Sequence, residues 1–139
     1  MHIKALLVAV GMCVAPILVQ AQNTHLRLPV ITMGRIHATE IKNGKMIPTP
    51  TTRQEILQNA LLLADVNNCQ VTEYRFSIIS PGQHYYGPVY VNGGELTDSL
   101  KNKIKQQNGP NVKIFIEGIK VNYRGNEMDV KGVALKYDE

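Results

Sequence analysis

The sequence predicts an α+β domain that is β-rich, antiparallel and sandwich-like, with two helices. Residues 69–80, "CQVTEYRFSIIS", alternate apolar and polar positions in the pattern of a half-buried strand. Residues 111–123 and 126–137 alternate in the same way and predict a C-terminal hairpin around "RGNE". Apolar residues at helical spacing in residues 48–66 and 95–107 predict the two helices.

The first helix has the clearest start signal in the chain. Thr52 and Glu55 form a capping box, in which each side chain can bond the other residue's backbone amide. The expected apolar face comprises Ile56, Leu57, Ala60, Leu61 and Ala64. We expect this helix to pack on the sheet.

The C-terminal hairpin is expected to change its buried face part-way along. The alternation shifts phase at Gly118 in one strand and at Gly132 in the other. Pairing Tyr123 with Met128 brings both shifts to the same level, where glycines permit a bend from one packing layer to another. Two unrelated bulges would give the same pattern only by coincidence. A second, tight hairpin is predicted at Asn43-Gly44.

The first 21 residues have the layout of a secretory signal peptide. A basic start at Lys4 precedes an apolar run that ends at Leu18, and Ala21 is the small residue before the expected cut. A retained membrane anchor is the alternative, although the run is shorter than the ~20 residues of a spanning helix and contains Pro16. We expect a periplasmic protein, or one exported to the cell envelope, that meets a membrane only by association or through a retained signal.

The length of the chain predicts a single domain, and its net charge argues against a nucleic-acid-binding protein. Removing 21 of the 139 residues leaves 118, which suffices for one domain and not for two. We expect an extended lead-in over residues 22–34 and a single domain over residues 35–139. Loss of Lys4 lowers the net charge from +4 to +3, and this mild value argues against nucleic acid as a partner. Cys69 would be the one remaining cysteine, so no internal disulfide is expected.

Catalytic and metal-binding motifs are missing from the sequence. It contains no Gly-x-Ser-x-Gly, no Ser-x-x-Lys and no His-Glu-x-x-His. The histidines that follow the expected signal peptide, His25, His37 and His84, lack metal-ligand spacing. We therefore expect a non-catalytic protein without catalytic residues, cofactor or metal, although residues that meet only in space would escape this search.

The segment "GQHYYGPVYVNGG", residues 82–94, looks most like a functional site. Gly82 and Gly87 have the separation of P-loop glycines, but Pro88 occupies the position of the phosphate-binding lysine. Phosphate binding is therefore not expected. Turns at both ends of a short strand, "GPVYV", account for the glycines.

The aromatic residues of this segment predict a partner-binding site. Adjacent Tyr85 and Tyr86 must point to opposite sides of an extended chain, so at least one is exposed. We expect His84, Tyr85, Tyr86 and Tyr90 to bind an envelope protein, by pairing along an edge strand that Pro88 keeps out of the sheet's middle. Alternatively, Pro88 only protects the edge from aggregation and the tyrosines cover the core.

From about residue 50 onward, the order of elements resembles the C-terminal periplasmic domain of the gliding-motility protein GldM. The shared order is helix, long strand, Gly-rich turn, amphipathic helix and two closing strands, with the family's strand pattern at Gly109, Val112, Ile114 and Ile119. In that family the periplasmic domains belong to the machinery of gliding and type IX secretion. The resemblance implies a non-catalytic envelope domain that binds proteins, but the membrane helix and long helical region needed for the motor role have no counterpart here.

The function expected from the sequence is that of an exported, non-catalytic binding or adaptor domain of the cell envelope, associated with gliding or type IX secretion. The alternative is a small periplasmic sensor or inhibitor-like domain that recognises a ligand or peptide. A hydrolase whose residues meet only in space is the third class.

We expect the mature protein to begin near Gln22, because an uncleaved apolar run would remain exposed. Intact-mass measurement of the protein from its native host tests this prediction. Met1 retained in a membrane fraction would instead identify the segment as an anchor.

Overall fold

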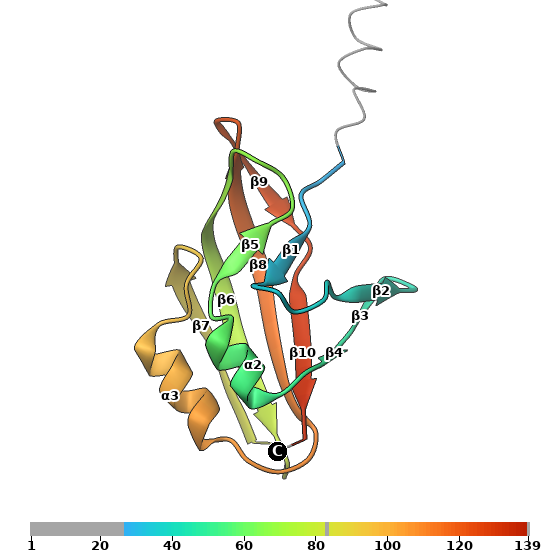
Figure 1. The fold of residues 1–139 in the computed structure, drawn as a ribbon, viewed down its shortest axis with the longest axis vertical. Helices are drawn as coiled ribbons and strands as arrows, with labels where there is room; N and C mark the ends of the chain where they lie inside the picture. The colour runs from blue at the N-terminus through green and yellow to red at the C-terminus, as the bar shows by residue number, and fades with distance from the viewer. Residues whose placement is uncertain (1–26, 83, 139) are drawn as a thin grey trace, which may run out of the picture.

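The structure, a computed structural model, describes residues 27–82 and 84–138 (Figure 1). The predicted α+β class, rich in antiparallel strands and with two helices, is confirmed. The predicted signal peptide, residues 1–21, lies outside the described residues. Within the described part of the chain, no helix is long and apolar enough to cross a membrane.

A six-stranded sheet forms the larger layer. Its strands are β4 (Thr49–Pro50), β6 (Cys69–Ser80), β7 (His84–Asn92), β8 (Val112–Tyr123), β9 (Asn126–Val130) and β10 (Val133–Tyr137). The order is β4-β10-β8-β6-β7, and β9 pairs with β8 beyond the start of β10. All pairs are antiparallel except β4 with β10. The long strands β6 and β8 therefore occupy the centre.

The second layer covers one face of this sheet. It consists of α2 (Arg53–Gln58), α3 (Asp98–Gln106) and the two-stranded sheet of β1 (Ile31–Met33) and β5 (Leu62–Ala64) (Figure 1). Ile31 and Met33, in the segment expected as a lead-in, are buried in the same hydrophobic cluster as the sheet residues. A hairpin of β2 (Glu40–Lys42) and β3 (Lys45–Ile47) projects to the side, with Asn43 and Gly44 at positive φ as predicted.

The first helix is shorter than predicted. Thr52 caps α2 by accepting a bond from the Glu55 amide, but the Glu55 side chain accepts from Thr51 and leaves the capping box half formed. At Asn59 both the backbone amide and the side-chain amide donate to the Glu55 carbonyl, and the chain leaves the helix. The helical interpretation of residues 60–64 was wrong, since Leu62 is buried as part of β5 while Leu61 and Leu63 are exposed.

The second helix follows the predicted pattern. Thr97 caps α3 by accepting from the Leu100 amide, and Leu100 and Ile104 are buried against the sheet. Asp98 lies in the first turn and lysines lie in the last, an order that suits the helix dipole.

The C-terminal hairpin has a tighter turn than predicted. Tyr123 pairs with Asn126, and Met128 pairs with Val121, so the predicted Tyr123–Met128 register is wrong by two residues. The reason is a two-residue turn in which Arg124 and Gly125 both adopt positive φ, where a four-residue loop was expected. A shift of two residues preserves which side chains share a face.

The phase shift in β8 is a bulge and does not transfer the strand to another packing layer. The pairing of β6 with β8 changes register between Glu73 and Arg75, opposite Gly118, which has a φ of 58°. The buried residues before and after it join one hydrophobic cluster. They are Val112, Ile114, Ile116, Ile119, Val121 and Tyr123. The bulge thus keeps the apolar side chains of β8 on the same face of the sheet, packed in a single hydrophobic core.

Replacing Gly132 with Val is expected to lower the free energy of unfolding by about 1–3 kcal/mol. A Cβ atom at Gly132 would lie 2.5 Å from the carbonyl oxygen of Ile116, so the two backbones would have to separate. Urea denaturation measures the change. Asp129→Val, at an exposed position of β9, is the control and should change stability by less than about 0.5 kcal/mol. Equal stability of Gly132→Val and the wild type would contradict the close approach.

Candidate partner-binding site

The predicted site residues lie on β7, at one edge of the six-stranded sheet. Among the described strands, β7 pairs with β6 alone, so its other side carries no strand partner. The edge position was predicted, but the strand is longer than "GPVYV" and extends from His84 to Asn92. An edge strand of nine residues offers backbone donors and acceptors to another strand.

A bulge at Gly87 interrupts the pairing of β7 without ending the strand. The register shifts between Phe76 and Ile78 of β6, where β7 contains one extra residue. Gly87 has a φ of 115°, and a Cβ there would lie 2.5 Å from the carbonyl oxygen of Phe76. Only glycine fits this close approach.

The bulge places Tyr85 and Tyr90 on the same face. Tyr85 pairs with Ile79 and Tyr90 pairs with Arg75, and these two β6 residues share the face opposite the helices. We call this the outer face of the sheet. Tyr85 is 56% exposed and Tyr90 is 72% exposed. The Tyr85 hydroxyl bonds the hydroxyl of buried Ser77 at 3.0 Å, which orients the ring.

The other two predicted residues have different surroundings. Tyr86 pairs with Ile78 on the core-facing side, is half-buried, and lies under the ammonium group of Lys103, 4.4 Å from the ring centre. Tyr86 therefore covers the edge of the core, as the alternative reading of the sequence proposed. His84 is exposed at the end of the strand, and its backbone oxygen accepts a bond from Ser80.

The outer face is hollowed beside Tyr85. A groove of about 440 Å³ lies between the sheet and the β2–β3 hairpin. Its lining includes Ser77, Ile79, Tyr85, Phe115, Glu117 and Met46. The sequence patterns did not predict Phe115 and Met46 as site residues. The sequence did contain an indication for Phe115, because an aromatic residue stands there at a position of β8 where the alternation predicts solvent exposure.

Two observations concern metal binding and thiol chemistry in the described part of the chain. Within residues 27–82 and 84–138, no group of three or more His, Cys, Asp and Glu could hold a metal ion. Burial, followed by the nearby charge of Asp65, raises the pKa of the Cys69 thiol. The reactive thiolate is therefore disfavoured there.

No family model matches the chain. A search of curated proteins also finds no match. The resemblance to the GldM domain stays a prediction.

Tyr74 holds in place the start of α3, the helix that lies beside β7. Its buried hydroxyl donates to the backbone oxygen of Glu95 at 2.6 Å, just before α3 begins. This bond positions the helix that carries Lys103 to Tyr86. Burial raises the pKa of Tyr74 from 10.0 to about 12, because the phenolate would lose solvation.

We expect the free energy of unfolding to fall as pH rises from about 10 towards 12, because Tyr74 then ionises in the unfolded chain but not in the fold. Tyr74→Phe lacks this contribution, so the stability difference between the wild type and the variant should shrink over that range. Chemical denaturation followed by circular dichroism at several pH values measures both. A difference that stays constant above pH 10 would contradict the raised pKa.

Proposed function

We propose that the protein is an exported, non-catalytic binding or adaptor domain of the cell envelope, which holds a partner protein at the β7 edge. The observation that carries the proposal is the combination on one strand of an unpaired edge with two exposed tyrosines, Tyr85 and Tyr90, on the same face.

Strand addition is the mode of binding that suits this edge. Backbone groups of β7 can pair with an extended segment of the partner, and this pairing supplies affinity with little dependence on sequence. Tyr85 and Tyr90 then supply selectivity, because tyrosine side chains bury a large area and have few rotatable bonds. The Ser77 hydroxyl already restrains Tyr85, which lowers the entropy lost on binding.

The cellular setting of the proposal comes from the sequence. The signal-peptide layout favours export, and the resemblance to the GldM domain favours a role beside the gliding or type IX secretion machinery. An envelope protein is accordingly the partner we propose.

A second candidate function is a sensor or inhibitor-like domain that recognises a peptide. The groove between the sheet and the β2–β3 hairpin favours it, because Phe115, Ile79 and Tyr85 offer an apolar lining for one side chain of a bound peptide. Under this alternative, short peptides bind without an intact partner protein.

The double variant Tyr85→Ser/Tyr90→Ser tests the proposal. Partner capture from the native envelope should fall at least tenfold, about 1.4 kcal/mol, because both tyrosines would contact the partner directly. The melting temperature should change little, since both side chains are largely exposed. Quantitative mass spectrometry of captured proteins and thermal denaturation are the two measurements.

Leu61→Ser/Leu63→Ser is the matched control, because it removes two exposed apolar side chains from the layer on the opposite side of the sheet from Tyr85 and Tyr90. The control should retain the partners. Unchanged capture by the tyrosine variant, or a loss of capture that matches a large loss of stability, would place the binding surface elsewhere.

A further inference from the structure

A second concave surface lies near the start of the described chain, away from β7. It is a groove of about 490 Å³ formed by three segments that are far apart in sequence. Its lining residues are Arg27, Leu28, Pro29, Val30, Ile31, Thr39, Ile41, Lys131 and Gly132. We call it the N-terminal groove. We infer that it binds the alkyl chain of a single-chain amphiphile with an anionic head group.

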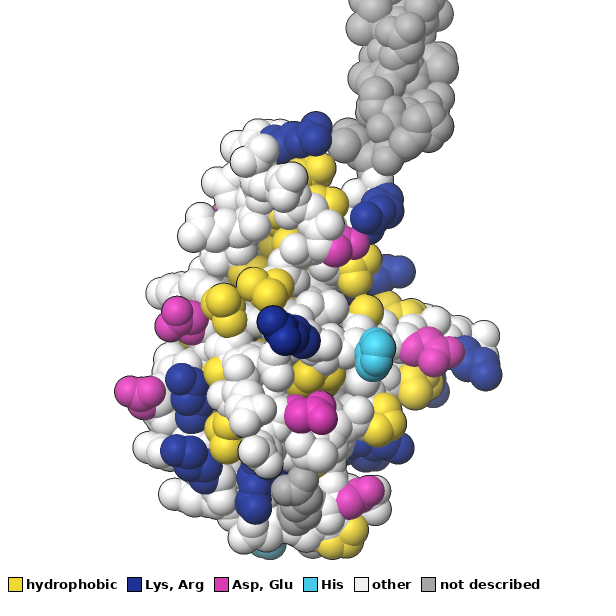
Figure 2. All heavy atoms as spheres, viewed as in Figure 1, with side chains coloured by type: hydrophobic (Ala, Val, Ile, Leu, Met, Phe, Trp, Pro, Cys, Tyr) yellow, Lys and Arg dark blue, Asp and Glu magenta, His cyan; other side chains and the backbone are white. Residues whose placement is uncertain are grey.

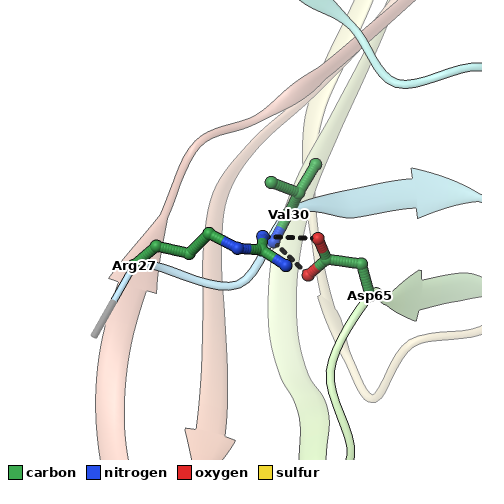
Figure 3. A network of polar contacts seen from close by, with 3 residues as sticks. All are labelled: Arg27, Val30 and Asp65. Carbon is green, nitrogen blue, oxygen red and sulfur yellow. Dashed lines mark hydrogen bonds and ion pairs between the residues drawn. The ribbon is translucent and has the colours of Figure 1, made fainter. Parts of the chain in front are cut away.

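One wall of the N-terminal groove is held by Asp65. The carboxylate accepts from the Arg27 guanidinium at 2.6 Å and from the Val30 amide at 2.9 Å (Figure 3). The Asp65 amide in turn donates to the Val30 carbonyl. The hydrogen bond from the Val30 amide, and after it the bond from the Arg27 side chain, hold the pKa of the Asp65 carboxyl below its usual range. The wall thus keeps its shape without a ligand.

The opposite wall is tied to the large sheet. The Thr39 hydroxyl donates to the carbonyl of Ala134 and accepts from its amide, so the chain that leads into β2 is fixed to β10. Between the walls, Gly132 adds no side chain. Pre-formed walls reduce the ordering cost of binding.

Three of the solvent-exposed lining residues are apolar. Leu28 is 52% exposed, Val30 is 41% exposed and Ile41 is 36% exposed. Figure 2 shows hydrophobic side chains between the first described residues and the β2–β3 hairpin. A volume of this size falls within the roughly 300–1,000 Å³ of small-molecule sites. Covering these three side chains with an alkyl chain removes apolar area from water.

The charges around the groove select the head group. Two cationic residues, Arg27 and Lys131, line it, and none of its lining residues is acidic. Asp65 compensates Arg27, whereas the exposed ammonium group of Lys131 forms no ion pair with any residue in the described ranges, 27–82 and 84–138. A carboxylate or sulfate beside Lys131 gains a charge-assisted contact, whereas a cationic head is repelled.

Calorimetric titration of the purified protein with dodecanoate, below its micelle concentration, tests the inference. Dodecyltrimethylammonium, which has the same chain and the opposite charge, is the comparison ligand. We expect dodecanoate to bind at least tenfold more tightly than the cation. Lys131→Glu should reverse this preference, and Leu28→Ser should weaken both ligands at least fivefold.

Ile47→Ser is the matched control. Ile47 belongs to the β2–β3 hairpin and is about as exposed as the groove residue Ile41, but it does not line the groove. It should leave binding unchanged. Equal affinity for the two amphiphiles, or no binding of either, would overturn the inference. So would a dimer that dissociates in Leu28→Ser, because the groove would then hold a second copy of the chain. Binding to anionic lipid vesicles in place of free dodecanoate would likewise overturn it in favour of a membrane surface.

Discussion

The structure depends on keeping the buried side chains of two long central strands on one face, because a single layer of helices and short strands covers the sheet. Bulges reset the alternation where β6 meets its two neighbours. Gly118 of β8 approaches Arg75, where an added Cβ would lie 2.6 Å from the guanidinium Nε, and Gly87 of β7 approaches the backbone of Phe76. Both glycines thus flank one short segment of β6. A side chain at Gly87 would push the backbones of β6 and β7 apart. A side chain at Gly118 would displace the Arg75 guanidinium and would be strained by the positive φ of this position.

The candidate binding surface follows from the same constraint. Tyr85 and Tyr90 are an odd number of residues apart and would face opposite sides of a regular strand. The extra residue at Gly87 turns both towards the outer face, while Val89 and Val91 remain packed on the core. A feature needed for packing therefore also determines which side chains a partner can reach.

Sequence patterns predicted the secondary structure correctly where the apolar residues fitted one periodicity. They failed where the same residues fitted both a helix and a strand. The strand of residues 69–80 and the helix carrying Leu100 admitted one interpretation. The run Leu61-Leu62-Leu63 fits either a helix face or a strand, and the bonds made by Asn59 decide in favour of a strand. The hairpin register failed because Arg124 adopts a positive φ, which is uncommon for arginine. The N-terminal groove could not be predicted, since its lining segments are far apart in the sequence and are positioned by tertiary contacts, among them the bonds of Asp65 and Thr39.

The two proposed surfaces lie apart in the strand order: β7 forms one end, and the N-terminal groove adjoins the β9–β10 junction, on the side of β8 away from β6. The bonds of Asp65 and Thr39 shape the N-terminal groove, whereas the Gly87 bulge and Ser77 shape the β7 surface. The β2–β3 hairpin contributes Ile41 to the groove and Met46 to the hollow beside Tyr85. The most exposed side chains of each, Leu28 and Tyr90, are not part of the hydrophobic core. Folding therefore does not require either ligand, and binding at each surface adds its own stabilisation by mass action. Under the two proposals, the amphiphile and the partner protein bind at separate places on one domain, with the β2–β3 hairpin between them.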